Sequence, residues 1–492
     1  MALARRILAR KAQLPALFIL LTCSAVAAGQ QPLVEDSGGF GRHQQPEPMS
    51  LVFTTDVDDE FDEQPATAPA VPPPPTASAP SESKPAKKTP TLPFDLNSKR
   101  MTGDWFGVRN WMDDHFIDLE IVYTSVYQRN FKGGLNTHNA DDWDGDLREN
   151  LYVDLDKMKL IPGGFFFIRG KSSYNDSVQA DVGSLESTSW TIAAGDHEIY
   201  VDKWWYGQRF LKDMIEFRVG KLLTPIDLFD MNTYAMNPWN QFLNQSMDMN
   251  PTVPHRKAPG LYMKFKPVDW LSFSSGMLNA NQTDSTKTFH CKTTFHNDPK
   301  WVGFYELILS PTLQGPNGSL PGNYRFGLDQ DGRVSPIFRN RIATTDGIPI
   351  YAQRQRSNNI GFYTSMDQFL WKENSDPKDK QGLGAFFRYG WKKRDINKIS
   401  DFWSIGAQYQ GLIPKRDNDV VAFGMNQSIL SSQYRHEVNV DADRETVYEW
   451  YYSIQITPWI FVTPDIQYIT EPGGLKHARD SLVGSIRVKI NL

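Results

Sequence analysis

The sequence predicts an all-β protein: a transmembrane antiparallel β-barrel of about 16 strands, preceded by a disordered N-terminal spacer and a short N-terminal helix. Three observations predict this fold. Apolar and polar residues alternate along many segments, aromatic residues gather beside tight turns, and the chain ends in one more alternating segment. Because successive side chains of a strand point to opposite faces, each segment offers one face to lipid and one to water. The last segment can close the barrel onto the first.

Residues 1–28 have the composition of a secretory signal peptide. Basic residues precede an apolar stretch from Leu14 to Ala28, which ends in small residues suited to cleavage. The basic residues are Arg5, Arg6, Arg10 and Lys11. We therefore expect the protein to be exported and to reside in the outer membrane of a Gram-negative type of cell.

Residues 29–100 are predicted to form a disordered periplasmic linker. They contain an acidic run from Asp56 to Glu63, a proline tract from Pro72 to Pro75 and a lysine cluster from Lys84 to Lys88. Such a composition cannot bury enough apolar surface to offset chain entropy, and the prolines favour an extended spacer. A role in binding a partner, for instance at the cell wall, stays open.

The composition excludes several other classes of protein. No run of 18 apolar residues follows the N-terminus, so the chain is too polar for membrane-spanning helices, and the mean hydropathy is -0.48. With 52 basic and 57 acidic residues, the charge argues against a nucleic-acid partner. Two cysteines cannot form a disulfide framework. The spacing of Cys291 from His290 and His296 is loose and favours a loop thiol over a metal site.

Order is predicted to begin with a short helix after Asp104, which can cap it, and to continue as residues 101–492 in alternating strands separated by turns. About 390 residues at roughly 24 per strand and connection give about 16 strands. The segments with the clearest alternation are Ile117–Gln128, Asn150–Leu155, Phe166–Lys171, Glu198–Asp202, Ile215–Val219, Leu261–Phe265, Leu271–Met277, Tyr448–Ile456, Ile460–Tyr468 and Ser485–Leu492.

The connections are predicted to be of two kinds. Short turns such as Pro267–Trp270 belong on the periplasmic side, and Trp450, Tyr452 and Trp459 lie near a similar turn, where a strand meets the lipid headgroups. Longer irregular segments are expected to be outer loops or segments folded into the lumen. These are Leu222–Pro259, Asn279–Lys300 and Leu328–Ser357.

Several short motifs occur in order along the chain from Thr102 to Leu492. They are Thr102-Gly-Asp-Trp-Phe-Gly-Val-Arg109, Tyr152-Val-Asp-Leu-Asp-Lys157 with Pro162-Gly-Gly164, Gly322-Asn-Tyr-Arg-Phe-Gly327, Asp367-Gln-Phe-Leu-Trp371, Gly411-Leu-Ile-Pro-Lys-Arg-Asp-Asn-Asp419 and Thr463-Pro-Asp-Ile-Gln-Tyr468. In this order the motifs resemble the carbohydrate-selective porin family known as OprB. The resemblance implies a water-filled barrel that passes small mono- and oligosaccharides by passive diffusion.

The polar faces of the predicted strands supply candidate pore-lining residues. Aromatic rings can contact the C–H surface of a sugar, and charged groups can replace the water bound to its hydroxyls. The candidates are Arg169, Lys171, Tyr152, Asp154, Glu198, Tyr200, Asp202, Trp204, Arg218, Asp465 and Gln467. Arg169 either contributes to sugar and charge selectivity or only pairs with Asp154 or Asp202 to hold the wall.

No catalytic chemistry is predicted, and neither a cofactor nor a metal site. The sequence contains no H-E-x-x-H, G-x-S-x-G or phosphate-loop motif. The Asp142-Trp-Asp144-Gly-Asp146 segment lacks the later residues of a calcium loop and is expected to be a solvated acidic loop. The expected partners are small carbohydrates, outer-membrane lipid and the barrel assembly machinery. A general non-selective porin and a secreted, soluble carbohydrate-binding β-protein remain as alternatives.

Overall fold

A computed structural model describes most of the chain after the spacer. The described residues are 92–174, 177–189, 197–281, 299–338, 341–345, 348–351, 354–376, 379–438 and 443–492. The predicted signal peptide, most of the predicted linker, and Cys291 with its neighbouring histidines lie outside the described residues. The side chain of Glu198 also lies outside them.

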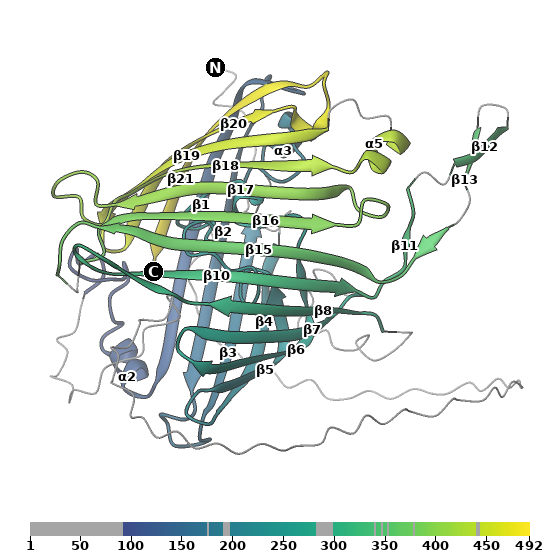
Figure 1. Cartoon of the computed structure of the whole chain (residues 1–492). Helices are drawn as coiled ribbons and strands as arrows, with labels where there is room; N and C mark the ends of the chain where they lie inside the picture. Colours follow the sequence, from purple (N-terminus) through teal and green to yellow (C-terminus); the bar gives the residue numbers. More distant parts are fainter. Residues whose placement is uncertain are drawn as a thin grey trace, which may run out of the picture. The chain divides into compact units, whose positions relative to one another are not determined.

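The described chain forms a closed antiparallel barrel (Figure 1). The main sheet contains seventeen strands. The short β9 (Thr312–Gly315) pairs only with the first residues of β10, so sixteen strands form the wall. Those sixteen are β1 (Ile117–Gly134), β2 (Asp141–Asp154), β3 (Gly164–Tyr174), β4 (His197–Phe210), β5 (Ile215–Thr224), β6 (Arg256–Val268), β7 (Leu271–Asn279), β8 (Trp301–Leu309), β10 (Gly318–Asp331), β15 (Asn359–Lys372), β16 (Gly382–Lys392), β17 (Ile399–Gln410), β18 (Val420–Leu430), β19 (Arg444–Thr457), β20 (Ile460–Thr470) and β21 (Arg479–Asn491). The predicted fold class is confirmed.

The barrel closes where the sequence predicts it. Strand β21 pairs antiparallel with β1, from Val122 opposite Asn491 to Gly134 opposite Arg479. Every other wall strand pairs with its neighbour along the wall, so the backbone groups of the wall strands find partners without water.

Alternation along each strand separates an outer apolar face from an inner polar one. On β6, Leu261 and Met263 are 46% and 38% exposed on the outside, whereas Tyr262 between them is 5% exposed and points inward. Because a lipid-facing residue counts as exposed when no lipid is present, this pattern is typical of a membrane barrel rather than of a water-soluble one.

Two further two-stranded sheets and several short helices lie in the connections. They are β11 (Ser335–Pro336) with β14 (Gln355–Arg356), β12 (Arg341–Thr345) with β13 (Ile348–Tyr351), α3 (Gln179–Val182), α4 (Gln245–Asp248), α5 (Ser432–Val438) and η1 (Pro472–Gly474). Within the described ranges no helix is both long and apolar enough to cross a bilayer.

The predicted N-terminal helix is α2 (Val108–Asp114), but Asp104 does not cap it. The helix begins after Gly107, whose φ of 99° favours glycine, and no side chain caps its N-terminus. The Asp104 side chain instead accepts a hydrogen bond from Asn110 Nδ2 at 2.6 Å. The expected cap is wrong because the chain turns sharply at Gly107 and satisfies the first helical N–H groups with backbone oxygens.

Residues 92–109 fasten the closing seam of the barrel. Arg109 is buried and donates from Nη2 to the backbone oxygen of Leu492 at 2.9 Å. The indole N–H of Trp459, in the β19–β20 turn, donates to the backbone oxygen of Asp95 at 3.1 Å, and the ring lies edge-on to Phe94 at 6.5 Å. Trp459 is only 8% exposed. The prediction that it contacts lipid headgroups is therefore wrong, because the N-terminal segment covers it.

These contacts predict the effect of N-terminal truncation. A mature chain that starts at Thr102 should insert and conduct like one that starts at Leu92, because the whole wall is present in both. It should be less stable by about 1–3 kcal/mol, since it lacks the Phe94 ring and the Asp95 acceptor of Trp459. Thermal unfolding in detergent measures the difference. Equal unfolding temperatures, or loss of insertion on truncation to Thr102, would contradict this account.

Candidate functional site: the barrel lumen

The predicted loop Leu222–Pro259 folds into the lumen. Strand β5 continues to Thr224 and β6 begins at Arg256, so the connection is residues 225–255, called here the inserted loop. Two aromatic residues fix it to different parts of the inner wall. Phe229 stacks on Phe304 of β8, with ring centroids 4.9 Å apart, and Phe242 meets Tyr451 of β19 edge-on at 5.1 Å. Both loop residues are fully buried, so the loop narrows the barrel from within.

Charged wall residues hold the backbone of the inserted loop. Arg388 of β16 is fully buried and donates to three successive carbonyl oxygens, from Ser246 to Asp248. Arg487 of β21 donates from Nη1 to the carbonyl oxygens of Pro238 at 2.6 Å and Gln241 at 2.8 Å. Charge-assisted hydrogen bonds of this kind are stronger than neutral ones, so the wall holds the loop in one position.

Close approach of the inserted loop requires small residues on the wall. A Cβ atom at Gly384 would collide with the ring of Tyr234, and one at Gly390 would collide with the side chains of Thr252 and Asn250. Both glycines belong to β16, the strand that also carries Arg388. The inserted loop therefore packs directly against the backbone of β16. The strand has glycine at these two positions because a side chain there would occupy the space of the loop.

Burial changes the charge that the inserted loop carries. It raises the pKa of Asp230 to about 8, although Arg388 opposes the shift, and it raises the pKa of Asp248 well above its ordinary value. A buried carboxyl group favours its neutral form because the charged form loses hydration. At neutral pH the loop is thus less negative than its sequence suggests.

Trp239 of the inserted loop lies against two arginines of the wall. The guanidinium carbon of Arg148 on β2 is 3.5 Å from the centre of the Trp239 ring, and that of Arg169 on β3 is 6.0 Å from it. Arg148 also pairs with Asp146, Nε to Oδ2 at 3.2 Å. The indole is therefore held at the lumen wall by a cation–π contact.

A chain of hydrogen bonds runs from Arg169 across two neighbouring strands. Arg169 Nε donates to Asn150 Oδ1 at 2.7 Å, and Asn150 Nδ2 donates to Glu120 Oε2 at 2.8 Å. In the other direction, Arg169 Nη1 lies 3.9 Å from Asp202 Oδ2. We call Glu120, Arg148, Asn150, Arg169 and Trp239 the Trp239 cluster. It combines an aromatic ring with donors and acceptors in fixed positions.

An aromatic wall lies next to this cluster on β3 and β4. Phe167 stacks on Trp205, with ring centroids 5.2 Å apart at 17°, and Phe165 meets Trp205 edge-on. Arg218 of β5 covers Trp205 at 4.6 Å and pairs with Glu216 at 2.7 Å. The lumen thus has a second surface where rings and a guanidinium lie together.

The register places most of the predicted pore-lining residues on the inner face. Tyr152 and Arg218 are half-buried, whereas Asp154, Lys171, Tyr200 and Asp202 are buried by neighbouring side chains. Asp202 accepts from Lys257 Nζ at 2.6 Å, and Lys171 lies 3.6 Å from Asp146. Asp154 pairs with Lys157 and not with Arg169. Of the two partners considered for Arg169, the structure therefore has Asp202.

The predicted position of Trp204 in the lumen is wrong. Arg169 is opposite Lys203 and Gly170 is opposite Val201, so Asp202 is an extra residue in β4. This bulge shifts the alternation by one position. Trp205 then points inward against Phe167, while Trp204 pairs with Ile168 on the outer face.

Asp465 and Gln467 of β20 face inward but are covered. Both are at most 2% exposed. Gln467 Nε2 donates to the backbone oxygen of Thr188 at 2.8 Å, and its Oε1 accepts from Asn244 of the inserted loop at 3.0 Å. They support the loop from behind and do not line an open channel.

The comparison with known families decides the relationship. Residues 138–492 match the family described as "Carbohydrate-selective porin, OprB family". The chain belongs to the OprB family. It is therefore an outer-membrane carbohydrate porin, a channel rather than an enzyme, and neither the non-selective porin nor the soluble binding protein is favoured.

Individual relatives of this OprB-family porin are distant in sequence but similar over most of their length. It is 20% identical over 434 residues to Porin B of Pseudomonas aeruginosa, which covers 80% of this chain and 92% of the relative. The solved high-pH structure of Pseudomonas putida OprB is 18% identical, with a TM-score of 0.72, and covers 82% of this chain and 100% of its own. That likeness shows the shared fold.

The sequence interpretation missed several lumen residues of this OprB-family porin. Trp239 lies in Leu222–Pro259, a segment expected to be an outer loop or to fold into the lumen, but the residue itself was not among the candidates. A lone tryptophan among polar residues was the available signal. Arg388 and Arg487 lie on the polar faces of strands, where alternation could have found them. The Asp142–Asp146 segment, expected to be a solvated loop, belongs to β2, and its Asp144 and Asp146 are buried in the lumen.

Proposed function

We propose that small mono- and oligosaccharides cross this porin by passive diffusion past the Trp239 cluster. The observation that carries the proposal is the position of Trp239: the inserted loop brings an aromatic ring to two wall arginines. Arg169 binds the Asn150 amide, which in turn binds the exposed Glu120 carboxylate. This combination matches the chemistry of a pyranose, which has an apolar C–H face and a polar edge of hydroxyl groups.

The polar edge of a sugar would exchange bound water for protein groups at little cost. The Arg169 guanidinium has several N–H donors in one plane, and it is already oriented by Asn150 and Asp202. Its side chain is 11% exposed, so only part of the group reaches the lumen. Because each contact is one of several weak ones, a sugar would pause at the cluster without being trapped, as passage requires.

We also propose the steps that bring the barrel to the outer membrane. Residues 1–28 direct export, and residues 101–492 are inserted by the barrel assembly machinery into outer-membrane lipid. Residues 29–100 form a linker that is solvated or binds a partner, except for its last residues, 92–100, where Phe94 and Asp95 pack against Trp459 of the barrel. The apolar outer face of the wall, for example Leu261 and Met263, supports contact with lipid.

The experiment that tests the proposal compares wild type with Arg169→Ala. Liposomes containing wild type should swell in glucose faster than in gluconate, an anion with a similar carbon frame. In planar bilayers Arg169→Ala should show weaker block of ion current by glucose and a shift toward cation passage, because a fixed positive charge and its donors are removed. Absence of swelling in any sugar would refute the proposal. Unchanged glucose block with a lower unfolding temperature would show that Arg169 only holds the wall.

A further inference from the structure

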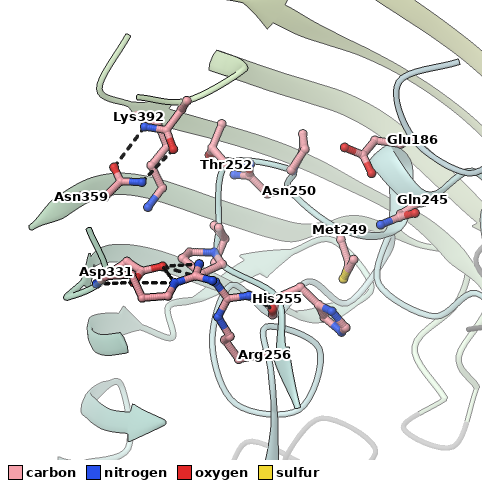
Figure 2. A pocket seen from close by; sticks show the side chains of 15 residues that line it. Glu186, Gln245, Met249, Asn250, Thr252, His255, Arg256, Asp331, Asn359 and Lys392 are labelled. Atoms are coloured by element: carbon pink, nitrogen blue, oxygen red, sulfur yellow. Dashed lines mark hydrogen bonds and ion pairs between the residues drawn. The ribbon is translucent and has the colours of Figure 1, made fainter. Parts of the chain in front are cut away.

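A polar cavity lies at the end of the barrel where the long connections gather. Its volume is ≈ 270 Å³. It lies between residues 249–255 of the inserted loop, with Arg256 at the start of β6, and the ends of β10, β15 and β16. Figure 2 shows Asp331, Arg256 and His255 on one side of it and Glu186 and Gln245 on another. We call it the loop-end pocket.

Two arginines share one carboxylate in this pocket. Arg333 binds Asp331 with two nitrogens, Nε to both oxygens at 3.1 Å and Nη2 to Oδ2 at 2.6 Å. Arg256 Nη2 lies 3.3 Å from the same Oδ2. Asp331 is 5% exposed, whereas the Arg333 side chain is 39% exposed. The carboxylate orients the guanidinium groups, and Arg333 keeps donors available at the pocket surface.

The rest of the lining supplies amides and an apolar surface. Asn359 and Asn397 donate to each other's side-chain oxygens at 2.8 and 3.0 Å, which fixes both amide planes. Pro251 and Pro254 of the inserted loop are half-buried and line the same pocket. Rigid polar groups beside a small apolar patch suit a ligand that has both a hydroxyl edge and a C–H face.

The charges in and around the pocket nearly cancel. Three basic side chains face three acidic ones: Arg256, Arg333 and Lys392 against Asp329, Asp331 and Glu186. Lys392 pairs directly with Asp329. Burial raises the pKa of Glu186 to about 7, which changes the sum by at most one charge. Each of the three basic side chains already pairs with a carboxylate, so the pocket has no unbalanced positive charge to attract an anionic ligand. An uncharged polyol is therefore the better match.

We propose that the loop-end pocket is a binding site for one neutral sugar ring, occupied before the sugar reaches the Trp239 cluster. This inference rests on the proposed passage of sugars through the lumen. The volume lies just below the range of pockets that hold drug-sized ligands, so it suits a single ring. The inserted loop lines this pocket with residues 249–255 and carries Trp239 earlier in its sequence, so one element serves both sites.

The test is current block by glucose in single channels, with Arg333→Ala as the variant. Arg333 lies just after β10 and outside the wall, so its removal leaves every wall strand intact. Glucose added on the side of the long loops, identified by its sensitivity to protease, should block with an association rate about five- to tenfold lower than in wild type, because one charge-assisted donor is lost. Glucose added on the opposite side should block as in wild type.

Arg444→Ala is the matched control. Arg444 binds Asp443 with two nitrogens at 2.8 and 3.0 Å, and its side chain is 44% exposed, which closely resembles Arg333. It does not line the pocket, so this control should leave glucose block unchanged. If Arg333→Ala shows the same glucose block as wild type from both sides of the membrane, the assignment of the pocket is overturned, but the proposed function is not. Absence of glucose block in wild type would overturn the proposed function as well, and a preference of the pocket for gluconate would overturn its assignment to a neutral ligand.

Discussion

The Arg388→Ala channel is expected to conduct more ions than wild type and to lose most of its glucose block. Arg388 is fully buried and bonds three successive carbonyl oxygens of the inserted loop. Without it, these three buried carbonyl oxygens lose their charged donor, and each unsatisfied buried acceptor costs about 1–3 kcal/mol. Because the barrel wall does not depend on this residue, the inserted loop should detach from β16 while the barrel stays closed. Single-channel conductance measures the change.

Limited proteolysis gives an independent reading of the same variant. The inserted loop should become cleavable in Arg388→Ala and stay protected in Arg394→Ala. Arg394 is a suitable control because it also pairs with a carboxylate, Asp401 at 3.5 Å, but its side chain is 61% exposed in the neighbouring turn. If Arg388→Ala keeps wild-type conductance and a protected loop, the remaining contacts of Phe229, Phe242 and Arg487 are enough to hold the loop, and the role given to Arg388 is wrong.

Trp239→Ala is expected to weaken glucose block roughly three- to tenfold, the factor that corresponds to an aromatic contact. The indole ring is the part of the Trp239 cluster that can contact the C–H face of a sugar. Removal of the indole leaves the polar groups of Arg169, Asn150 and Glu120 in place. Trp239→Phe should recover most of the block because it restores an aromatic face. Titration of the ion current with glucose gives the apparent affinity of each variant.

Trp270→Ala serves as the control for loss of a tryptophan. Trp270 is 57% exposed in the turn between β6 and β7, outside the lumen cluster, so its removal should not change glucose block. If Trp239→Ala raises conductance but leaves glucose affinity unchanged, the indole only fills space in the lumen. A fall in unfolding temperature without a change in block would likewise assign Trp239 to holding the loop against Arg148.

The sequence by itself determined the wall of this porin. Alternation with a period of two is a local property of a strand, so the faces of segments such as Ile117–Gln128 and Ser485–Leu492 follow from residue order alone. Closure of the last strand onto the first follows from the cost of an unpaired strand edge in lipid. The motifs, in their order along the chain, indicated the OprB family. The inner position of Arg169 followed from its lipid-facing neighbours Phe166 and Ile168.

Only the tertiary structure decided what occupies the lumen. The bulge at Asp202 exchanges Trp204 for Trp205 on the inner face, and a bulge depends on the partner strand rather than on the alternation of its own residues. The path of the inserted loop depends on contacts with distant strands, such as Phe229 with Phe304 and Arg487 with Pro238. No local pattern encodes such pairings. For this reason the sequence placed the pore wall, whereas Trp239 and the loop-end pocket required the assembled barrel.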